Sequence, residues 1–256
     1  MKRERIYVDN RRKKILDLME TRPEVRVEEL IEIFHVSPAT IRRDLQYLED
    51  SQKLVRFYGG AVIKRQEEQK QKEVMLYRDL IARYAASLVE DGDTLFINTS
   101  SNALEMLRYM NRNNVTVITN NGRAINYEHH EGISVILTGG ELRYPKEVMA
   151  GDFAIRNLQT IFAKKSFVGC SGISEECGMT TEIASEVNIN ALMLNNALKE
   201  TYILADHTKI GKNSSFISCG IEQIGNLITD ELAPMDQLKL MQEKGVKVHI
   251  VKKENR

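Results

Sequence analysis

The chain has 256 residues, of which 42% are hydrophobic, and its 36 Lys and Arg balance 36 Asp and Glu. This apolar content supports one small and one medium domain, each with its own core, and argues against a disordered chain. No run of 18 apolar residues occurs and no apolar segment follows the charged start, so we expect no export, no membrane insertion and a cytoplasmic protein.

The amino-terminal fifty residues contain three stretches with helical periodicity. Apolar residues recur at helical spacing in Arg12–Glu20 and in Val27–Phe34. Ser37 is suited to cap a third helix, with Pro38 at its first position. Only two residues separate the second helix from this cap, and a turn of that length is typical of a helix-turn-helix motif.

The third helix has one apolar side and one polar side. Ile41, Leu45 and Leu48 recur at i, i+4 and i+7, so the opposite side carries hydrogen-bonding groups. Arginine can bind guanine edges or phosphate, glutamine can bind adenine, and threonine suits phosphate or a thymine methyl group. A solvated charged face is the alternative. The residues we expect to contact DNA are Ser37, Ala39, Thr40, Arg42, Arg43 and Gln46.

A short hairpin is predicted after the third helix. Lys53–Val62 contains two short apolar runs around Gly59 and Gly60, which favours a tight turn between two strands. Three helices followed by a small basic hairpin predict a winged helix-turn-helix domain over residues 1–62, with double-stranded DNA as its partner. A winged helix that binds protein remains the alternative.

These residues resemble the DeoR-type bacterial transcription regulators. The likeness rests on Val36–Leu45 and on Arg56 with Gly59–Ala61. The family usually has histidine before the paired glycines, whereas this chain has Tyr58, which can also reach phosphate and joins the expected DNA contacts. The resemblance implies a repressor of carbohydrate-metabolism genes whose carboxy-terminal domain senses a sugar phosphate.

Residues 63–75 are the expected linker. The segment Lys64–Glu73 consists entirely of charged and amide residues. Because Gln, Glu and Lys favour helices, the sequence leaves both a flexible and a helical linker open.

Residues 76–256 show short β-branched runs that alternate with helical stretches such as Ala103–Met110 and Ile189–Leu198. This alternation predicts a Rossmann-like α/β domain with a mainly parallel sheet. The expected strands are Thr94–Ile97, Val115–Ile118, Ser134–Leu137, Ser166–Val168, Thr201–Leu204, Leu227–Thr229 and Val246–Val251.

Small or polar residues follow five of these strands in succession. Ligands of open α/β sheets bind at the carboxyl ends of the strands, where helix N-termini favour phosphate. Neutral polar groups together with one lysine indicate a small, polyhydroxylated, phosphorylated ligand. Ordinary turns are the alternative at each single position. The expected ligand-binding residues are Asn98, Thr99, Ser100, Ser101, Asn102, Thr119, Asn120, Gly139, Gly140, Gly169 and Lys209.

The resemblance extends through this half, where the DeoR-type sensor domain is similar in fold to ribose-5-phosphate isomerase. By that resemblance, Asn98–Asn102 holds the phosphate and Lys209 helps to neutralise it. The family commonly has an Asp-x-Gly-Thr-Thr type of loop, whereas Asn98–Asn102 has neither glycine nor carboxylate. This departure implies a narrower site, another sugar preference or a lost ligand. Further matching residues are Phe167–Gly169, Gly172, Gly178–Thr181, Glu186, Asp206, Thr208, Thr229 and Asp230.

Two other functions for the second domain stay open. A sugar-phosphate isomerase needs a carboxylate base beside the sugar, but Glu182, Glu186 and Asp206 do not form a clustered acidic loop in the sequence, so we expect no enzyme activity. Alternatively, the domain only oligomerises. Self-association is expected either way, because a single winged helix contacts few base pairs.

The cysteines and histidines indicate neither a metal nor a cofactor. Cys170, Cys177 and Cys219 form no Cys-x-x-Cys pair and are expected to be reduced thiols. Cys170 and Cys177 lie close enough in sequence for a redox pair to be considered, although we do not favour it. The five histidines lack the spacing of metal ligands.

Overall fold

The computed structural model describes residues 2–253, with side chains described for all of these except 2–6 and 65–67. The chain divides into two compact units, Met1–Glu73 and Val74–Arg256. Helix α4 (Lys64–Ser87) contains residues of both units. Residues 64–75 of the expected linker therefore lie in a helix, although the side chains of 65–67 are outside the described residues. No helix in the described chain combines the length and apolarity needed to cross a bilayer.

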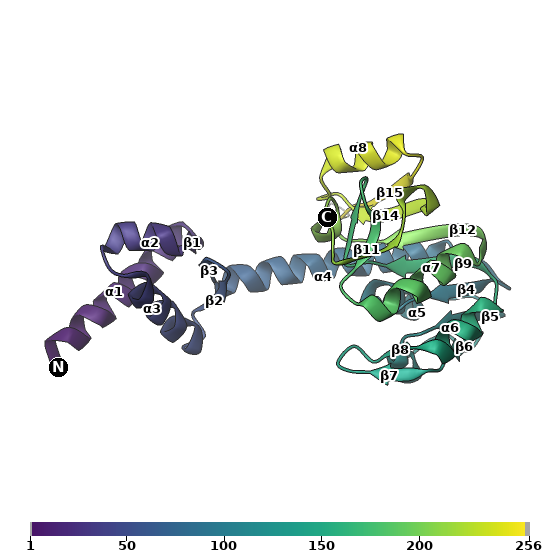
Figure 1. The fold of residues 1–256 in the computed structure, drawn as a ribbon, viewed down its shortest axis with the longest axis horizontal. Helices are drawn as coiled ribbons and strands as arrows, with labels where there is room; N and C mark the ends of the chain where they lie inside the picture. The colour runs from purple at the N-terminus through teal and green to yellow at the C-terminus, as the bar shows by residue number, and fades with distance from the viewer. Residues whose placement is uncertain (1, 254–256) are drawn as a thin grey trace. The chain divides into compact units, whose positions relative to one another are not determined.

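The first unit contains three helices and a three-stranded antiparallel sheet of order β1-β3-β2 (Figure 1). The apolar sides of the helices, with Ile15, Leu30 and Leu45 among them, form one core. The first helix begins ten residues before the expected Arg12, because few apolar residues mark its first turns. The elements are α1 (Lys2–Thr21), β1 (Glu24–Arg26), α2 (Val27–Phe34), α3 (Pro38–Asp50), β2 (Leu54–Phe57) and β3 (Gly60–Ile63).

The hairpin turn between β2 and β3 requires both of its glycines. Gly59 has φ +85°, a left-handed conformation that favours glycine. At Gly60 a Cβ atom would lie 2.4 Å from the carbonyl oxygen of Val25 on β1. The hairpin thus closes against a strand that the sequence pattern did not reveal.

The second unit is built around a parallel sheet of seven strands, which confirms the predicted α/β class. All seven expected runs are strands of this sheet. The strand order is β15-β14-β12-β9-β4-β5-β6. The strands are β4 (Thr94–Ile97), β5 (Val115–Thr119), β6 (Ile133–Leu137), β9 (Ala163–Gly169), β12 (Ala197–Leu204), β14 (Asn226–Asp230) and β15 (Lys247–Val251).

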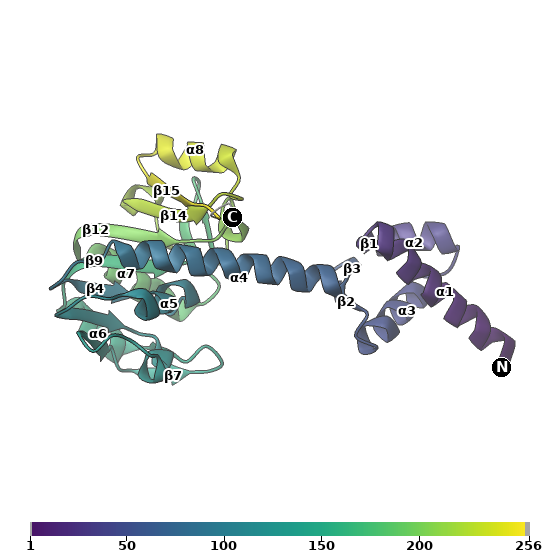
Figure 2. The ribbon, with the colours of Figure 1, turned by 180° about the vertical axis from the view of Figure 1, so that it is seen from behind.

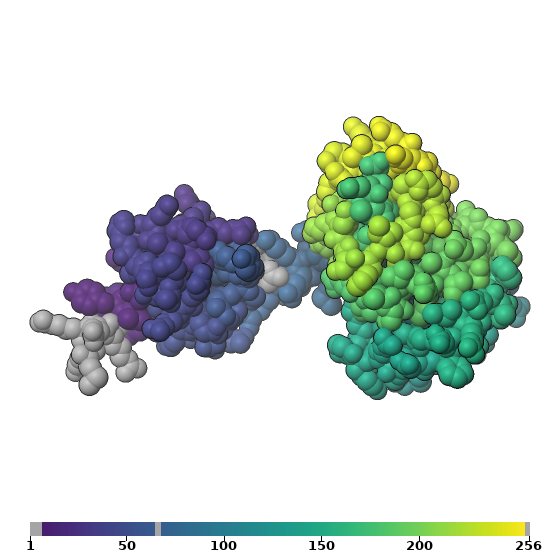
Figure 3. Space-filling view, viewed as in Figure 1, coloured from purple at the N-terminus to yellow at the C-terminus, as the bar shows by residue number. Residues whose placement is uncertain are grey.

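Helices cover both faces of this sheet, because side chains alternate between the faces along each strand. Leu95 and Ile97 belong to a core with α4 and α5 (Ser101–Tyr109), which Figure 2 shows in front of the sheet. Phe96 belongs to the opposite core, with α6 (Asp152–Gln159), α7 (Val187–Asn195) and α8 (Met235–Glu243). In Figure 3 the surface of this unit passes from teal near the β6 edge to yellow near the β15 edge, as the strand order requires.

Shorter elements extend the loops at the sheet. One hairpin follows β6, and one small antiparallel sheet combines two strands that follow β9 with one that follows β12. Their strands are β7 (Glu141–Arg143), β8 (Val148–Ala150), β10 (Gly172–Ser174), β11 (Gly178–Thr181) and β13 (Phe216–Cys219). The 3₁₀ turns are η1 (Gly122–Asn126), η2 (Ala184–Glu186), η3 (His207–Lys209) and η4 (Ile221–Gln223).

The strand order reverses between β4 and β9. From the β6 edge of the sheet, neighbouring strands come progressively earlier in the sequence as far as β4. From β9 to the β15 edge they come progressively later. In open α/β sheets the crevice at such a reversal, outside the carboxyl ends of the strands, is where ligands bind. The topology therefore directs attention to the loops after β4 and β9.

Candidate functional sites

Helix α3 begins at the capping residue expected from the sequence. The Ser37 hydroxyl accepts a hydrogen bond from the backbone N–H of Thr40, and Pro38 is the first helical residue. The preceding helix α2 ends at His35, whose φ of 50° is left-handed. This residue turns the chain sharply before α3, whose start is exposed at Ser37, Pro38 and Ala39 and half-buried at Thr40.

The outer side of α3 carries two unengaged guanidinium groups. Arg42 and Arg43 are exposed, and neither forms an ion pair or hydrogen bond with another described residue. Gln46 donates to Asp50 at 2.8 Å, and Arg12 lies over the ring of Tyr47 at 3.7 Å. Two arginines on one convex surface can reach phosphates and base edges of a groove.

A buried carboxylate joins α3 to α1. Asp44 is 1% exposed and accepts from Nε of Arg11 at 2.5 Å and from Nε of Arg12 at 2.9 Å. These contacts engage two of the basic residues near the amino terminus in the interior of the unit. They also fix the rotation of α3, which sets the direction of Arg42 and Arg43.

The hairpin is joined to α3 by a second ion pair. Glu49 accepts from the backbone N–H of Arg56 at 2.9 Å and from its Nε at 2.8 Å. These two hydrogen bonds lower the pKa of Glu49 from its ordinary value. Arg56 is thereby engaged, whereas Tyr58 at the turn is fully exposed. Tyr58 is the most exposed of the large apolar and aromatic side chains of the hairpin.

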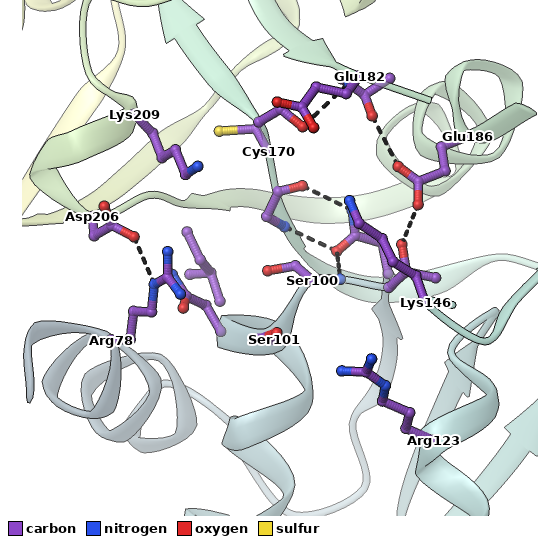
Figure 4. A pocket seen from close by; sticks show the side chains of 17 residues that line it. Arg78, Ser100, Ser101, Arg123, Lys146, Cys170, Glu182, Glu186, Asp206 and Lys209 are labelled. Carbon is purple, nitrogen blue, oxygen red and sulfur yellow. Dashed lines mark hydrogen bonds and ion pairs between the residues drawn. The ribbon is translucent and has the colours of Figure 1, made fainter. Parts of the chain in front are cut away.

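A cavity of about 290 Å³ lies in the second unit at the reversal of strand order. Its lining comes mainly from the loops that follow β4, β9 and β12. Figure 4 shows Ser100 and Ser101 in its middle, with Lys209, Arg78 and Asp206 on one side and Arg123 and Lys146 on the other. The lining residues are Arg78, Asn98–Asn102, Arg123, Lys146, Gly169–Ser171, Thr181, Glu182, Glu186, Leu204, Asp206 and Lys209.

Asn98 joins the ends of the two central strands. Its Oδ1 accepts from the backbone N–H of Gly169 at 3.0 Å and from that of Ser100 at 3.2 Å. Its Nδ2 donates to the carbonyl of Gly169 at 2.9 Å and to Asn190 at 3.0 Å. The asparagine is thus fully engaged, and its position in the expected ligand loop is explained by this bracing of β4 against β9.

The N-terminus of α5 opens into the cavity. Ser100 is its N-cap residue, but its side chain makes no capping hydrogen bond. A Cβ atom at Gly169 would lie 1.9 Å from the Ser100 hydroxyl oxygen, so only glycine allows this close approach. Free N–H groups at a helix start, with the positive end of the helix dipole, form a favourable place for an anion.

Three carboxylates also reach the cavity, although the sequence does not cluster them. Glu186 is 6% exposed and accepts from the hydroxyls of Thr99 at 2.7 Å and Thr181 at 2.9 Å. Asp206 is 1% exposed and forms an ion pair with Arg78 at 2.8 Å. Burial alone raises the pKa of Asp206, but hydrogen bonds from Thr208 and Arg78 outweigh it and lower the pKa below its ordinary value.

The cationic side chains are more numerous than the sequence indicated. Lys209 was expected, whereas Arg78, Arg123 and Lys146 come from α4, η1 and the β7–β8 loop, where no local pattern marks them. Arg78 pairs with Asp206. The side chains of the other three form no ion pair with any described residue. No sequence signal short of the strand order could have grouped these positions.

Four of the expected ligand-binding residues do not line the cavity. Thr119 and Asn120 follow β5 and are buried, and Asn120 donates to the carbonyl of Met149. Gly139 and Gly140 follow β6, and Gly140 is close to the backbone of Ala150. Both segments follow strands that lie between β4 and the β6 edge of the sheet, whereas the strand order reverses on the other side of β4, between β4 and β9. The other seven expected residues do line the cavity.

The cysteines are free thiols in the structure. Cys170 borders the cavity, and burial raises the pKa of its thiol to about 12. A thiol with this pKa stays protonated at neutral pH and is a poor nucleophile.

Two family models match the chain. The model of the DeoR-like helix-turn-helix domain matches residues 11–67, and that of the DeoR C terminal sensor domain matches residues 74–231. Solved structures resemble the chain only weakly. Ribose 5-phosphate isomerase A of Methanocaldococcus jannaschii covers 52% of each chain at 18% identity and TM-score 0.36, and eIF2B beta of Chaetomium thermophilum covers 69% of this chain and 56% of its own at 14% identity and TM-score 0.43.

Several relatives are similar over most of their length. The regulator YulB of Bacillus subtilis is 33% identical, over 96% of this chain and 98% of its own. The transcriptional repressor GlcR of the same organism is 30% identical, over 97% and 98%. The lactose phosphotransferase system repressor of Staphylococcus aureus is 30% identical, over 84% and 89%. The resemblance in the sequence is thus confirmed: the chain belongs to the DeoR family of helix-turn-helix transcriptional regulators.

Proposed function

We propose that this regulator represses carbohydrate-metabolism genes and that a phosphorylated sugar in the cavity controls its affinity for operator DNA. The observation that carries the proposal is the convergence of Lys209, Arg123 and Lys146, without partners among the described residues, around the open N-terminus of α5. Uncompensated cations and a helix N-terminus in one concave site favour a small anion.

The phosphate end of the ligand is assigned to the loop Ser100–Asn102 and to Lys209. The backbone N–H groups of the first turn of α5 supply donors in the arrangement that phosphate prefers. Lys209 adds a positive charge on one side and Arg123 on the other (Figure 4). Because Asn98 is engaged within the protein, it acts in this proposal by holding the loop in place.

The sugar end is assigned to the opposite wall. Glu186 and Thr99 present oxygen atoms there, and Glu182 and Ser171 lie beside them. Carboxylates and hydroxyls accept hydrogen bonds from sugar hydroxyls, and an ionised carboxylate does so strongly. A volume of about 290 Å³ suits a monosaccharide phosphate, because ligand pockets begin at about this size.

The DNA contacts are assigned to the outer side of α3 and to the hairpin. Ser37, Thr40 and Tyr58 are suited to phosphates, and Arg42, Arg43 and Ala39 to the major groove. Gln46 can join them if it leaves Asp50. One winged helix contacts few base pairs, so the proposal includes a homo-oligomer on a repeated operator.

Names of relatives support the carbohydrate assignment. They include a lactose phosphotransferase system repressor and a putative aga operon transcriptional repressor of Escherichia coli O157:H7. These names describe regulators, and none of them describes an enzyme, which supports a sensing cavity without turnover.

Ligand binding can be tested directly with the purified full chain. Isothermal titration with glucose 6-phosphate, fructose 1-phosphate, fructose 6-phosphate and galactose 6-phosphate should give saturable binding for at least one of them, and none for its unphosphorylated sugar. Lys209→Gln should weaken that binding by roughly tenfold or more, because a charge-assisted hydrogen bond is lost. The matched control is Lys212→Gln, an exposed lysine three residues away that does not line the cavity.

Two results would count against the proposal. Binding of a free sugar as tightly as of its phosphate would exclude the assigned phosphate end. Equal loss of binding in the Lys209→Gln and Lys212→Gln variants would show that the effect of the lysine is unspecific.

A further inference from the structure

Helix α4 contributes a single described side chain to the cavity. Arg78 projects from it, and every other lining residue lies after β4 begins. The same helix begins at Lys64 and includes the boundary between Glu73 and Val74. A ligand in the cavity can therefore meet directly a helix whose first residues belong to the DNA-binding unit.

The guanidinium of Arg78 is only partly engaged. Its Nε donates to Oδ2 of Asp206 at 2.8 Å, while its two Nη groups form no hydrogen bond with any described residue. The other carboxylate oxygen of Asp206 accepts from the backbone N–H of Thr208 at 3.0 Å and from the Thr208 hydroxyl. Asp206 thus fixes the direction of Arg78 and leaves the outer pair of nitrogens available to a second acceptor.

The neighbouring residue ties α4 to the same loops. Tyr77 is 2% exposed, its hydroxyl donates to Glu231 at 3.1 Å, and its ring meets the ring of His207 edge-on at 5.8 Å. His207 in turn is 2.9 Å from Asp230. The turn His207–Lys209 therefore contacts α4 through one end and supplies Lys209 to the cavity at the other.

We propose that Arg78 binds the ligand's phosphate through its Nη groups while Nε stays on Asp206, and that this bridge is how the ligand acts on α4. The inference rests on the proposed function. Figure 4 shows Arg78 beside Asp206, on the side of the cavity that also holds Lys209. Arginine offers donors on two edges of one plane, so it can hold a carboxylate and a phosphate together. Lysine or glutamine cannot make both sets of contacts.

The bridge gives the ligand different contacts in two states of the helix. In one state α4 presents Arg78 to the cavity, and the phosphate gains its Nη groups as hydrogen-bond donors. In the other state Arg78 is turned away, and the phosphate lacks these donors. A ligand shifts an equilibrium only by such a difference in affinity, and operator binding must respond by the same factor. The proposal thus assigns one side chain to both ligand affinity and transmission to the helix.

The test measures how ligand changes operator affinity in the full chain. Fluorescence anisotropy on labelled DNA from upstream of its own gene gives the operator Kd with and without a saturating sugar phosphate, chosen from the four above by its effect on wild type. The ratio of the two is the coupling factor, which we expect to be about 5- to 150-fold in wild type. Saturation is confirmed by titration for each variant.

Arg78→Gln should bind the sugar phosphate about tenfold more weakly, because the charged donors are lost. At saturation its coupling factor, measured against its own ligand-free operator affinity, should still be close to one. Arg78→Lys, which keeps the charge, should be intermediate and guards against a folding defect in the glutamine variant. The matched control is Arg83→Gln on the same helix, because Arg83 pairs with Asp79, is 58% exposed and does not line the cavity.

The outcomes separate this inference from the proposed function. A wild-type coupling factor of one with every sugar phosphate would defeat the proposed function itself. A responsive wild type together with full coupling in saturated Arg78→Gln would overturn the bridge and leave the proposed function intact. Loss of coupling in Arg83→Gln as well would also overturn it, because any change on α4 would then suffice.

Discussion

The outer side of α3 and the cavity of the second unit both present uncompensated positive charge, but in opposite shapes. On α3 the two free guanidinium groups are neighbours in sequence and stand on a convex, exposed surface. In the cavity, cations from η1, the β7–β8 loop and η3 that have no partner among the described residues converge on the start of α5, beside the Arg78–Asp206 pair.

We propose that the two shapes serve different anions. A convex pair of long side chains can follow an extended polyanion and reach base edges, since neither arginine is held by an internal partner. A concave group of donors around a helix N-terminus encloses one compact anion and excludes a duplex. The two regions can therefore be altered separately.

The largest expected effect is on operator affinity. The double change Arg42→Ala with Arg43→Ala should weaken operator binding by about 30- to 10⁴-fold, because each lost base contact costs about 1–3 kcal/mol. Sugar-phosphate affinity should be unchanged. Anisotropy at one fixed salt concentration measures the first quantity and calorimetry the second. Operator affinity close to wild type would mean that the other side of α3 or the hairpin provides recognition.

Filling the junction between the central strands should damage the cavity and leave the DNA-binding unit intact. Gly169→Ala places a Cβ atom 2.3 Å from the Ser100 Cβ, so we expect a loss of about 1–3 kcal/mol in stability and loss of ligand binding. Adding Ser100→Gly removes both close contacts and should restore most of the stability. Urea unfolding of the single and double variants measures this. A single variant as stable as wild type would contradict the tight approach of β9 and α5.

Removing the cap of α3 should have a moderate effect confined to the first unit. Ser37→Ala removes the hydrogen bond to the backbone N–H of Thr40 and should lower that unit's free energy of unfolding by about 1 kcal/mol. Thermal unfolding followed by circular dichroism measures the change. Ser37→Gly, which costs only a few tenths of a kcal/mol at such positions, is the matched comparison. Equal destabilisation by alanine and glycine would argue against a capping role.

The smallest expected effect is a dependence of stability on pH. Because folding lowers the pKa of Asp206, the ionised carboxylate contributes to the free energy of unfolding. This contribution is complete above about pH 4, near the pKa of about 3.9 in the unfolded chain, and it is lost as the pH falls through the lower pKa in the folded protein. Stability should thus be insensitive to Asp206 between pH 8 and 5. Asp206→Asn should be less stable at pH 7 and should lose less on acidification. The effect is limited because Arg78 is 38% exposed, so solvent screens the pair.

How far the sequence alone could lead depends on whether the determinants are local. Each feature of the DNA-binding unit that the sequence predicted depends on a few neighbouring residues. Helical periodicity and turn chemistry therefore identify the cap at Ser37, the outward direction of Arg42 and Arg43, and the hairpin glycines. The seven parallel strands were predictable for the same reason, because each contains a short run of β-branched, aromatic or other apolar residues. Strand β1 has only three residues and no such signal.

The cavity depends on the order of strands, which the sequence pattern does not contain. The loops after β5 and β6 are rich in small and polar residues, like those after β4 and β9, but only the latter flank the reversal of strand order. Arg78 lies in a helix of charged and apolar residues, and its role is visible only from its contact with Asp206, which is 128 positions away in sequence. Asn98 resembles a ligand-binding residue until its four internal hydrogen bonds are seen.

The most direct measurement is operator affinity by fluorescence anisotropy at fixed salt, with each sugar phosphate and with its unphosphorylated sugar. We expect one phosphate to change the operator Kd by about fivefold or more, its free sugar to have no effect, and Lys209→Gln to abolish the response at the same ligand concentration. Specific operator binding that no sugar phosphate alters would contradict effector control. The second unit would then be an oligomerisation domain, and its converging cations would need another explanation.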